Sequence, residues 1–279
     1  MRFGARVHDF GKGTVEELAP QIAAKGFSSV QLALAKAITN IDSGLGRLNP
    51  GMAYHIGSVF SRHQLQVAVL GCYINMVHPD PVERRKLIER FKEHIRYARD
   101  FGTSIVGTET GSLNADYSFH PGNDCEEAFQ SLLPVVAELV AEAEQFGVFV
   151  CIEGVASHTV TTNTKMKRVL DTIQSNNLQV IFDPVNLITA ANYQEQDRVI
   201  NEAFEWFGDK IVTIHAKDFV IENGKKKIVP VGQGWLNYEL FLKTIKTRKP
   251  YINIMLEDAK PETAAASMQF LNELDQTIN

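Results

Sequence analysis

Four segments in the second half of the chain share one pattern and decide the fold: VCIEG at 150–154, VIFDPVN at 180–186, VTIHAKD at 212–218 and IMLED at 254–258. In each segment, an apolar run leads directly into an acidic residue or a histidine. Nearly continuous apolar runs of this length are typical of strands that are buried on both faces, as in parallel sheets. The four segments therefore predict four parallel strands, each of which ends on a polar side chain.

Similar apolar runs recur along the whole chain, and each is followed by a loop and an amphipathic helical segment. The expected strands cover 3–7, 29–33, 66–71, 104–107, 148–153, 179–183, 211–215 and 251–257. The expected helices cover 15–25, 52–63, 81–101, 126–146, 164–175, 194–207, 238–247 and 261–274. Eight strand–helix units in 279 residues predict an α/β fold with a single (β/α)8 TIM barrel domain over residues 1–279.

Local signals support the helix starts and weaken the competing fold. Thr14 is a suitable N-cap for the first helix, and Asp80 precedes Pro81, which suits a first helical turn. A doubly wound sheet is the alternative α/β arrangement. The glycine fingerprint GxGxxG, which such a sheet often carries after its first strand, is absent from the sequence.

A lysine-rich segment follows the seventh expected strand. The sequence FVIENGKKKIVP at 219–230 predicts a β-hairpin that turns at Asn223-Gly224. Charged residues are common at exposed hairpin tips, so Lys225–Lys227 are expected to be solvated there.

Composition and charge limit the classes of function. The formal net charge is −5, which fits poorly with binding to a phosphate backbone. The three cysteines are sparse and lack the spacing of a disulfide framework. No segment approaches the roughly 20 apolar residues of a membrane span, and the N-terminal MRFGARVHDFGKG lacks a signal-peptide core. We therefore expect a cytoplasmic protein that binds neither nucleic acid nor membranes.

Polar residues at the strand ends predict a metal site. The carboxyl ends of the strands form the active face of a (β/α)8 barrel, and four consecutive strands end in Glu153, Asp183, His215 and Glu257. One charged residue at a barrel mouth is commonly just solvated, but four in succession favour a common site. Three carboxylates and an imidazole suit one divalent ion, foremost Mn²⁺, with Mg²⁺, Co²⁺, Fe²⁺ or Zn²⁺ as alternatives.

The same motifs carry a resemblance to a known family. The chain is similar to the sugar phosphate isomerase/epimerase superfamily, whose xylose-isomerase-like barrels include the ketose 3-epimerases. The resemblance rests on IEG, FDPVN, HAKD and LED in this order, on YINMVHPDP at 73–81 and on VGQGWLNYELF at 231–241. It extends over essentially the whole chain. Two positions depart from the pattern, because Gly154 stands where many relatives have proline and Asn186 where many have histidine.

The resemblance implies a metal-dependent isomerase or epimerase of a small sugar. The metal would polarise a ketose carbonyl, a carboxylate would remove the neighbouring proton, and an enediolate would form. Glu153 and Glu257 would be both ligands and proton carriers, and Asp183 and His215 chiefly ligands. Relatives are often dimers or tetramers, so a homodimer or homotetramer is expected. The expected substrate-binding residues are His8, Glu109, His158, Asn186 and Lys217, with a surface position as the alternative for His158 and a loop-capping role as the alternative for Glu109.

Three other functions stay open at this point. A dehydratase of a keto-inositol or related polyol would use the same metal and the same proton abstraction. A DNA-repair enzyme similar to the apurinic endonucleases would need three zinc ions and more histidines. A non-catalytic carbohydrate-binding barrel would need no metal. The number of metal ions per chain therefore separates the isomerase or dehydratase from the other two.

Overall fold

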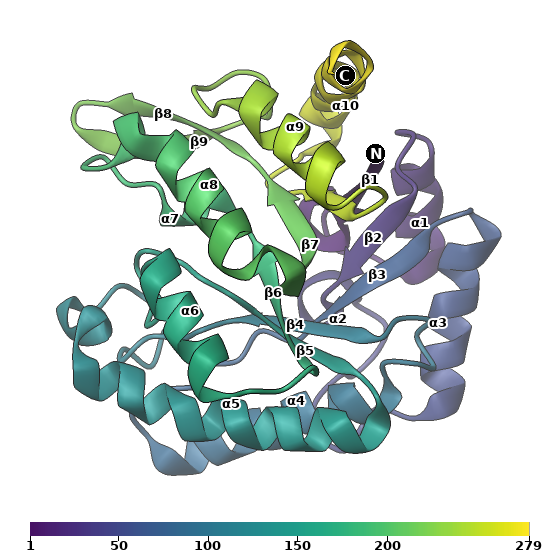
Figure 1. Cartoon of the computed structure of the whole chain (residues 1–279). Helices are drawn as coiled ribbons and strands as arrows, with labels where there is room; N and C mark the ends of the chain where they lie inside the picture. Colours follow the sequence, from purple (N-terminus) through teal and green to yellow (C-terminus); the bar gives the residue numbers. More distant parts are fainter. Residues whose placement is uncertain (279) are drawn as a thin grey trace.

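The predicted apolar runs pair side by side and close into a parallel barrel in the computed structural model, which describes residues 1–278 (Figure 1). The strand order around the barrel is β1-β10-β7-β6-β5-β4-β3-β2, and β1 pairs with both β10 and β2. The (β/α)8 prediction is therefore confirmed. The barrel strands are β1 (Arg2–Arg6), β2 (Ser29–Leu32), β3 (Gln66–Gly71), β4 (Ile105–Glu109), β5 (Phe149–Glu153), β6 (Leu178–Phe182), β7 (Ile211–Ala216) and β10 (Asn253–Leu256).

Helices surround the barrel and bury their apolar faces against it (Figure 1). None of the helices within residues 1–278 has both the length and the apolar character needed to cross a membrane. The α-helices are α1 (Val15–Ala23), α2 (Leu34–Ala37), α3 (Pro50–Arg62), α4 (Pro81–Tyr97), α5 (Glu126–Phe146), α6 (Asn163–Thr172), α7 (Pro184–Leu187), α8 (Gln196–Phe207), α9 (Tyr238–Arg248) and α10 (Pro261–Thr277). Short 3-10 helices are η1 (Val7–Phe10), η2 (Pro121–Asp124), η3 (Tyr193–Glu195) and η4 (Gly208–Lys210).

The helix-start signals are confirmed, and two strand boundaries are corrected. Thr14 caps α1 in a capping box with Glu17, and Asp80 caps α4 through two backbone N–H groups. The first strand was predicted as 3–7, but Val7 already begins η1. The eighth strand was predicted from residue 251, but Tyr251 has a φ of 69°. That left-handed conformation is incompatible with a strand, so β10 begins two residues later.

Small side chains let the barrel interior close. Val69, Cys151 and Ile181 form a buried cluster that is separate from the large core between barrel and helices. A Cβ atom at Gly107 would lie 2.6 Å from Ile181 Cδ1, so a larger residue would require the Ile181 side chain to shift within this buried cluster. Cys151 is fully buried, as expected for a residue within the apolar run VFVCI at 148–152.

The β-hairpin after β7 is present, but one of its lysines is not solvated. It consists of β8 (Asp218–Glu222) and β9 (Lys225–Val229), and both turn residues, Asn223 and Gly224, have positive φ, as type I′ turns require. Lys225 and Lys227 are exposed. Lys226 instead donates to Val185 O at 2.6 Å and to Ile188 O at 2.5 Å. The prediction of a solvated tip was wrong for Lys226 because side chains alternate along a strand, and this one points toward α7.

Candidate active site

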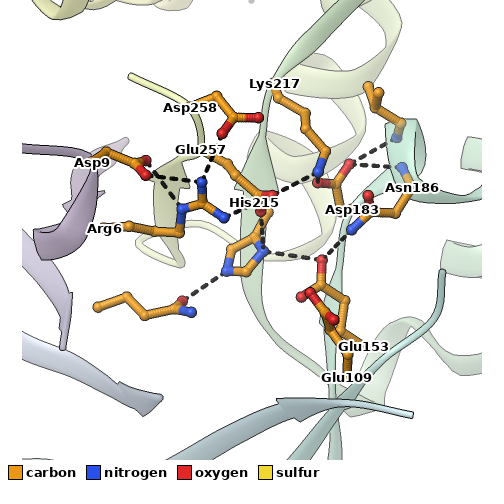
Figure 2. A network of polar contacts seen from close by, with 12 residues as sticks. Arg6, Asp9, Glu109, Glu153, Asp183, Asn186, His215, Lys217, Glu257 and Asp258 are labelled. Carbon is orange, nitrogen blue, oxygen red and sulfur yellow. Dashed lines mark hydrogen bonds and ion pairs between the residues drawn. The ribbon is translucent and has the colours of Figure 1, made fainter. Parts of the chain in front are cut away.

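The four residues predicted as metal ligands come together at the mouth of the barrel (Figure 2). Each offers one ligand atom, and these atoms all lie within 4.8 Å of one another. Glu153 ends β5 and His215 lies in β7, whereas Asp183 and Glu257 directly follow β6 and β10. The exposed fractions of Glu153, Asp183 and His215 are 2%, 1% and 0%. Neighbouring parallel strands bring their carboxyl ends to one rim, which explains why residues so distant in sequence meet here.

Ion pairs connect the three carboxylates through two cationic groups. His215 Nδ1 lies 3.1 Å from Glu153 Oε1 and 3.0 Å from Glu257 Oε2. Lys217 Nζ lies 2.7 Å from Glu257 Oε1 and 3.2 Å from Asp183 Oδ2 (Figure 2). The ligand atoms of the three buried carboxylates lie within 4.8 Å of one another, and their negative charges repel. Positive charge between them is therefore needed for the site to be stable.

Arg6 provides further positive charge at the rim of the site. Its guanidinium lies 2.8 Å from Glu257 Oε1 and also pairs with Asp9 and Asp258 (Figure 2). Burial alone would raise the pKa of Glu257, but Lys217 and Arg6 outweigh this effect and hold it well below its ordinary value. Glu257 is therefore ionised at neutral pH.

Burial and the neighbouring charges also shift the other site residues. Burial lowers the pKa of His215, but the carboxylates of Glu153 and Glu257 outweigh burial and raise it to about 10. Burial raises the pKa of Asp183, and Lys217 offsets this only partly. The imidazole of His215 thus gains a proton because of its carboxylate neighbours, whereas Asp183 is costly to ionise chiefly because it is buried.

The side chains fit a divalent cation. Asp183 Oδ1 accepts hydrogen bonds from the N–H groups of Val185 and Asn186 and so caps α7. Asp183 Oδ2 is buried and accepts no hydrogen bond from any described residue. Buried polar atoms are normally satisfied, so this oxygen is available as a ligand. Three carboxylates and one imidazole without a thiolate form a donor set suited to Mn²⁺, Mg²⁺ and similar ions.

Two of the residues expected to bind substrate lie inside this network. Asn186 Nδ2 donates to Glu153 Oε1 at 2.6 Å, so Asn186 orients a carboxylate of the candidate metal site. Lys217 is buried and held by its two carboxylate partners. Asn186 therefore contacts Glu153 directly, and Lys217 contacts Glu257 directly.

Of the other expected contacts, Glu109 and His158 lie near Glu153, whereas His8 lies in η1 after β1. Glu109 pairs in register with Glu153 across β4 and β5, and its Oε2 lies 3.5 Å from His158 Nδ1. The ring of His158 packs edge-on against Tyr117 at a centroid distance of 4.9 Å. The Nδ1 atom of His8 is buried and has no hydrogen-bond partner among residues 1–278.

A pocket of about 480 Å³ adjoins these residues on the side of β3 and β4. Its lining includes Lys36, Tyr73, Asn75, Glu109 and Tyr117, and Lys36 Nζ lies 3.6 Å from the centroid of the Tyr73 ring. Burial, followed by the charges of Glu153 and Glu257, raises the pKa of Glu109 to about 7. The pocket therefore offers a mixed set of donors and acceptors next to the candidate metal site.

Sequence reasoning missed Gln31, Tyr73 and Lys36. Gln31 is 1% exposed and contacts His215 Nε2. One signal was present, because Gln31 is a polar residue within the apolar strand SVQLAL at 29–34. Tyr73 opens the motif YINMVHPDP, but the sequence does not show that it meets Lys36 in a pocket, since this depends on how α2 and the loop after β3 pack together.

The profile of the xylose isomerase-like TIM barrel family matches residues 20–274. The chain belongs to this family. The resemblance indicated by the strand-end motifs is thereby confirmed. No curated protein gave a significant sequence match.

Solved structures share this fold over nearly their full lengths. A D-tagatose 3-epimerase-like protein has 18% identity and a TM-score of 0.77, with 100% of this chain and 98% of that chain covered. A xylose isomerase-like TIM barrel protein from Mycobacterium smegmatis, solved with magnesium, has 14% identity, a TM-score of 0.76 and coverages of 100% and 98%. The probable 3-DHS dehydratase AsbF from Bacillus anthracis has 14% identity, a TM-score of 0.75 and coverages of 98% and 99%. At these identities the similarity establishes the fold.

Proposed function

We propose that the protein is a metal-dependent isomerase or epimerase of a small sugar or sugar derivative. The observation that carries the proposal is the group of four buried donors, Glu153, Asp183, His215 and Glu257, within 4.8 Å of one another. The family assignment and the epimerase-like neighbour support a sugar substrate. The magnesium in the M. smegmatis relative supports a divalent ion, and we infer Mn²⁺ as the first ion to test, with Mg²⁺, Co²⁺, Fe²⁺ and Zn²⁺ as alternatives.

The two glutamates are the proposed proton carriers. Glu153 and Glu257 contact the same atom, His215 Nδ1. They approach it from opposite sides of β7, because β10 is the neighbour of β7 on one side and β5 lies two strands away on the other. A substrate carbon between them would therefore meet a carboxylate on each face. When bound, the divalent ion would supply polarisation of the substrate carbonyl, which acidifies the neighbouring C–H group.

Contacts to each glutamate suggest different tasks for its neighbours. Arg6 and Lys217 hold Glu257 as a carboxylate, so Glu257 can accept a proton at neutral pH. Asn186 donates to Glu153 and can orient that carboxylate but cannot itself carry a proton. Proton transfer therefore depends on the two glutamates, and Asn186 and Lys217 bind and orient.

The adjoining pocket would hold the rest of the sugar. Its volume of about 480 Å³ lies within the roughly 300–1,000 Å³ common for small-molecule sites. Lys36 and Glu109 would hydrogen-bond hydroxyl groups, and the ring of Tyr73 offers an apolar surface. His158 and His8 would contribute from the rim.

The test combines metal analysis with solvent exchange. We expect about one divalent ion per chain after reconstitution, and incorporation of deuterium from D2O next to the carbonyl of a ketose in a panel of free and phosphorylated sugars. Glu153→Gln and Glu257→Gln should each abolish product formation. Loss of water from a keto-inositol, without isomerised product, would support a dehydratase instead. A reconstituted protein without metal, or without exchange on any ketose, would refute the proposal.

A further inference from the structure

A buried glutamine contacts the side of His215 that faces away from the carboxylates. His215 Nε2 lies 2.7 Å from Gln31 Oε1, and Gln31 Nε2 donates to the hydroxyl of Tyr73 at 2.8 Å. Gln31 and His215 have exposed fractions of 1% and 0%. Gln31 belongs to β2, which is three strands away from β7 around the barrel, so only closure of the barrel brings the two together.

The chemistry of these three groups fixes which imidazole nitrogen carries the proton. A carbonyl oxygen only accepts hydrogen bonds, so a hydrogen bond to Gln31 Oε1 requires a proton on His215 Nε2. A metal ion would displace the second proton of the charged imidazole, which leaves a neutral ring with one N–H group and a lone pair on its other nitrogen. That other nitrogen is Nδ1, which faces Glu153 and Glu257. Tyr73 completes the arrangement because it accepts from the amide nitrogen and so orients the carbonyl oxygen toward His215.

We propose that Gln31 is a positioning residue of the candidate metal site, and that its carbonyl holds the proton of His215 on Nε2 so that Nδ1 faces the ion. This inference rests on the proposed function, which requires metal binding, and adds a residue to it. Hydrogen bonds of this kind to metal-binding histidines set the tautomer and the ring orientation. The relay also reaches the substrate pocket, because Tyr73 lines that pocket under Lys36.

Two substitutions at Gln31 separate an acceptor role from simple packing. Gln31→Leu keeps most of the volume but removes the acceptor, whereas Gln31→Glu keeps an oxygen that can accept from Nε2. Gln179→Leu is the matched control. Gln179 is also buried, with an exposed fraction of 8%, and lies in β6, where it donates to the backbone of Asn176 rather than to the site.

The experiment is a calorimetric titration of the metal-free full chain with MnCl2. We expect Gln31→Leu to weaken Mn²⁺ binding about 10- to 100-fold, the usual effect of losing such a partner. Gln31→Glu should stay within about threefold of wild type or bind more tightly, since carboxylates serve the same purpose in many metal sites. Gln179→Leu should leave the Mn²⁺ affinity unchanged, even if it lowers the Tm.

A spectroscopic measurement reads the tautomer directly. In the diamagnetic Mg²⁺- or Zn²⁺-loaded wild type, ¹⁵N NMR should show the proton of His215 on Nε2 and none on Nδ1. Wild-type affinity in Gln31→Leu, or a proton on Nδ1, would overturn the inference while leaving the proposed function intact. A wild-type chain that binds no divalent ion would overturn both.

Discussion

Replacement of Asp183 by asparagine should abolish metal binding while the barrel stays folded. Asp183 Oδ1 already accepts from two backbone N–H groups, and the oxygen of asparagine can retain both hydrogen bonds. The substitution replaces Oδ2 with an amide nitrogen. Oδ2 lies 3.2 Å from Lys217 Nζ and accepts no hydrogen bond from residues 1–278. An amide NH2 group at that position would direct a donor, not a lone pair, toward the ion.

The size of the effect follows from the number of ligands. Loss of one of four protein donors should exceed the roughly 10- to 100-fold loss typical of removing a partner that only orients a ligand. We therefore expect Mn²⁺ affinity to fall by at least about 100-fold, or about 2.7 kcal/mol. The metal-free protein should lose little stability. Burial raises the pKa of Asp183, which means that its ionised form opposes folding at neutral pH, and the neutral amide removes this cost.

Calorimetric titration and thermal unfolding with and without Mn²⁺ measure both quantities. The matched control is Asp80→Asn, because Asp80 caps α4 through the same kind of backbone contacts but lies on the surface. Mn²⁺ should raise the Tm of wild type and of the control but not that of Asp183→Asn. Wild-type Mn²⁺ affinity in Asp183→Asn would refute the ligand assignment, and a large loss of stability without metal would refute the argument about charge.

Three further predictions concern residues around the site. Lys226→Met should lower the free energy of unfolding by about 1–3 kcal/mol, because two carbonyls lose a charged donor. The control Lys225→Met, at an exposed position, should change it little. Equal denaturant midpoints for the two variants would argue against docking of the hairpin onto α7. Asp218→Ala should lower the free energy of unfolding by about 3 kcal/mol or more, since the backbone N–H groups that donate to this carboxylate lose their acceptor. A denaturant midpoint equal to that of the wild type would contradict this. Burial lowers the pKa of His94 from its ordinary value of about 6.5 to about 4. As the pH falls, His94 is therefore protonated in the unfolded chain before it is protonated in the folded protein. The free energy of unfolding should decrease as the pH drops from about 6.5 toward 4. His94→Gln should flatten this dependence in unfolding measured at several pH values, exposed His63→Gln should not, and identical slopes in both variants would exclude His94 as the cause.

Local patterns in the sequence were sufficient to predict the architecture and the centre of the candidate site. Apolar runs and helical periodicity depend on local order, so they predicted eight strand–helix units, and α5 (Glu126–Phe146) begins and ends where its pattern does. The candidate ligand residues could be found because barrel topology brings the carboxyl end of every strand to one rim. No contact between Glu153 and Glu257 had to be known in advance to place them there.

The groups that surround these residues depend on tertiary packing and could not be predicted from local patterns. Gln31 and His215 are 184 positions apart, and their contact exists because the barrel closes through β1 and β10. Lys226 looked like its neighbours in the sequence, but strand alternation and the position of α7 separate it from them. Side-chain contacts across a closed barrel depend on register and packing, and neither leaves a periodic signal along the chain.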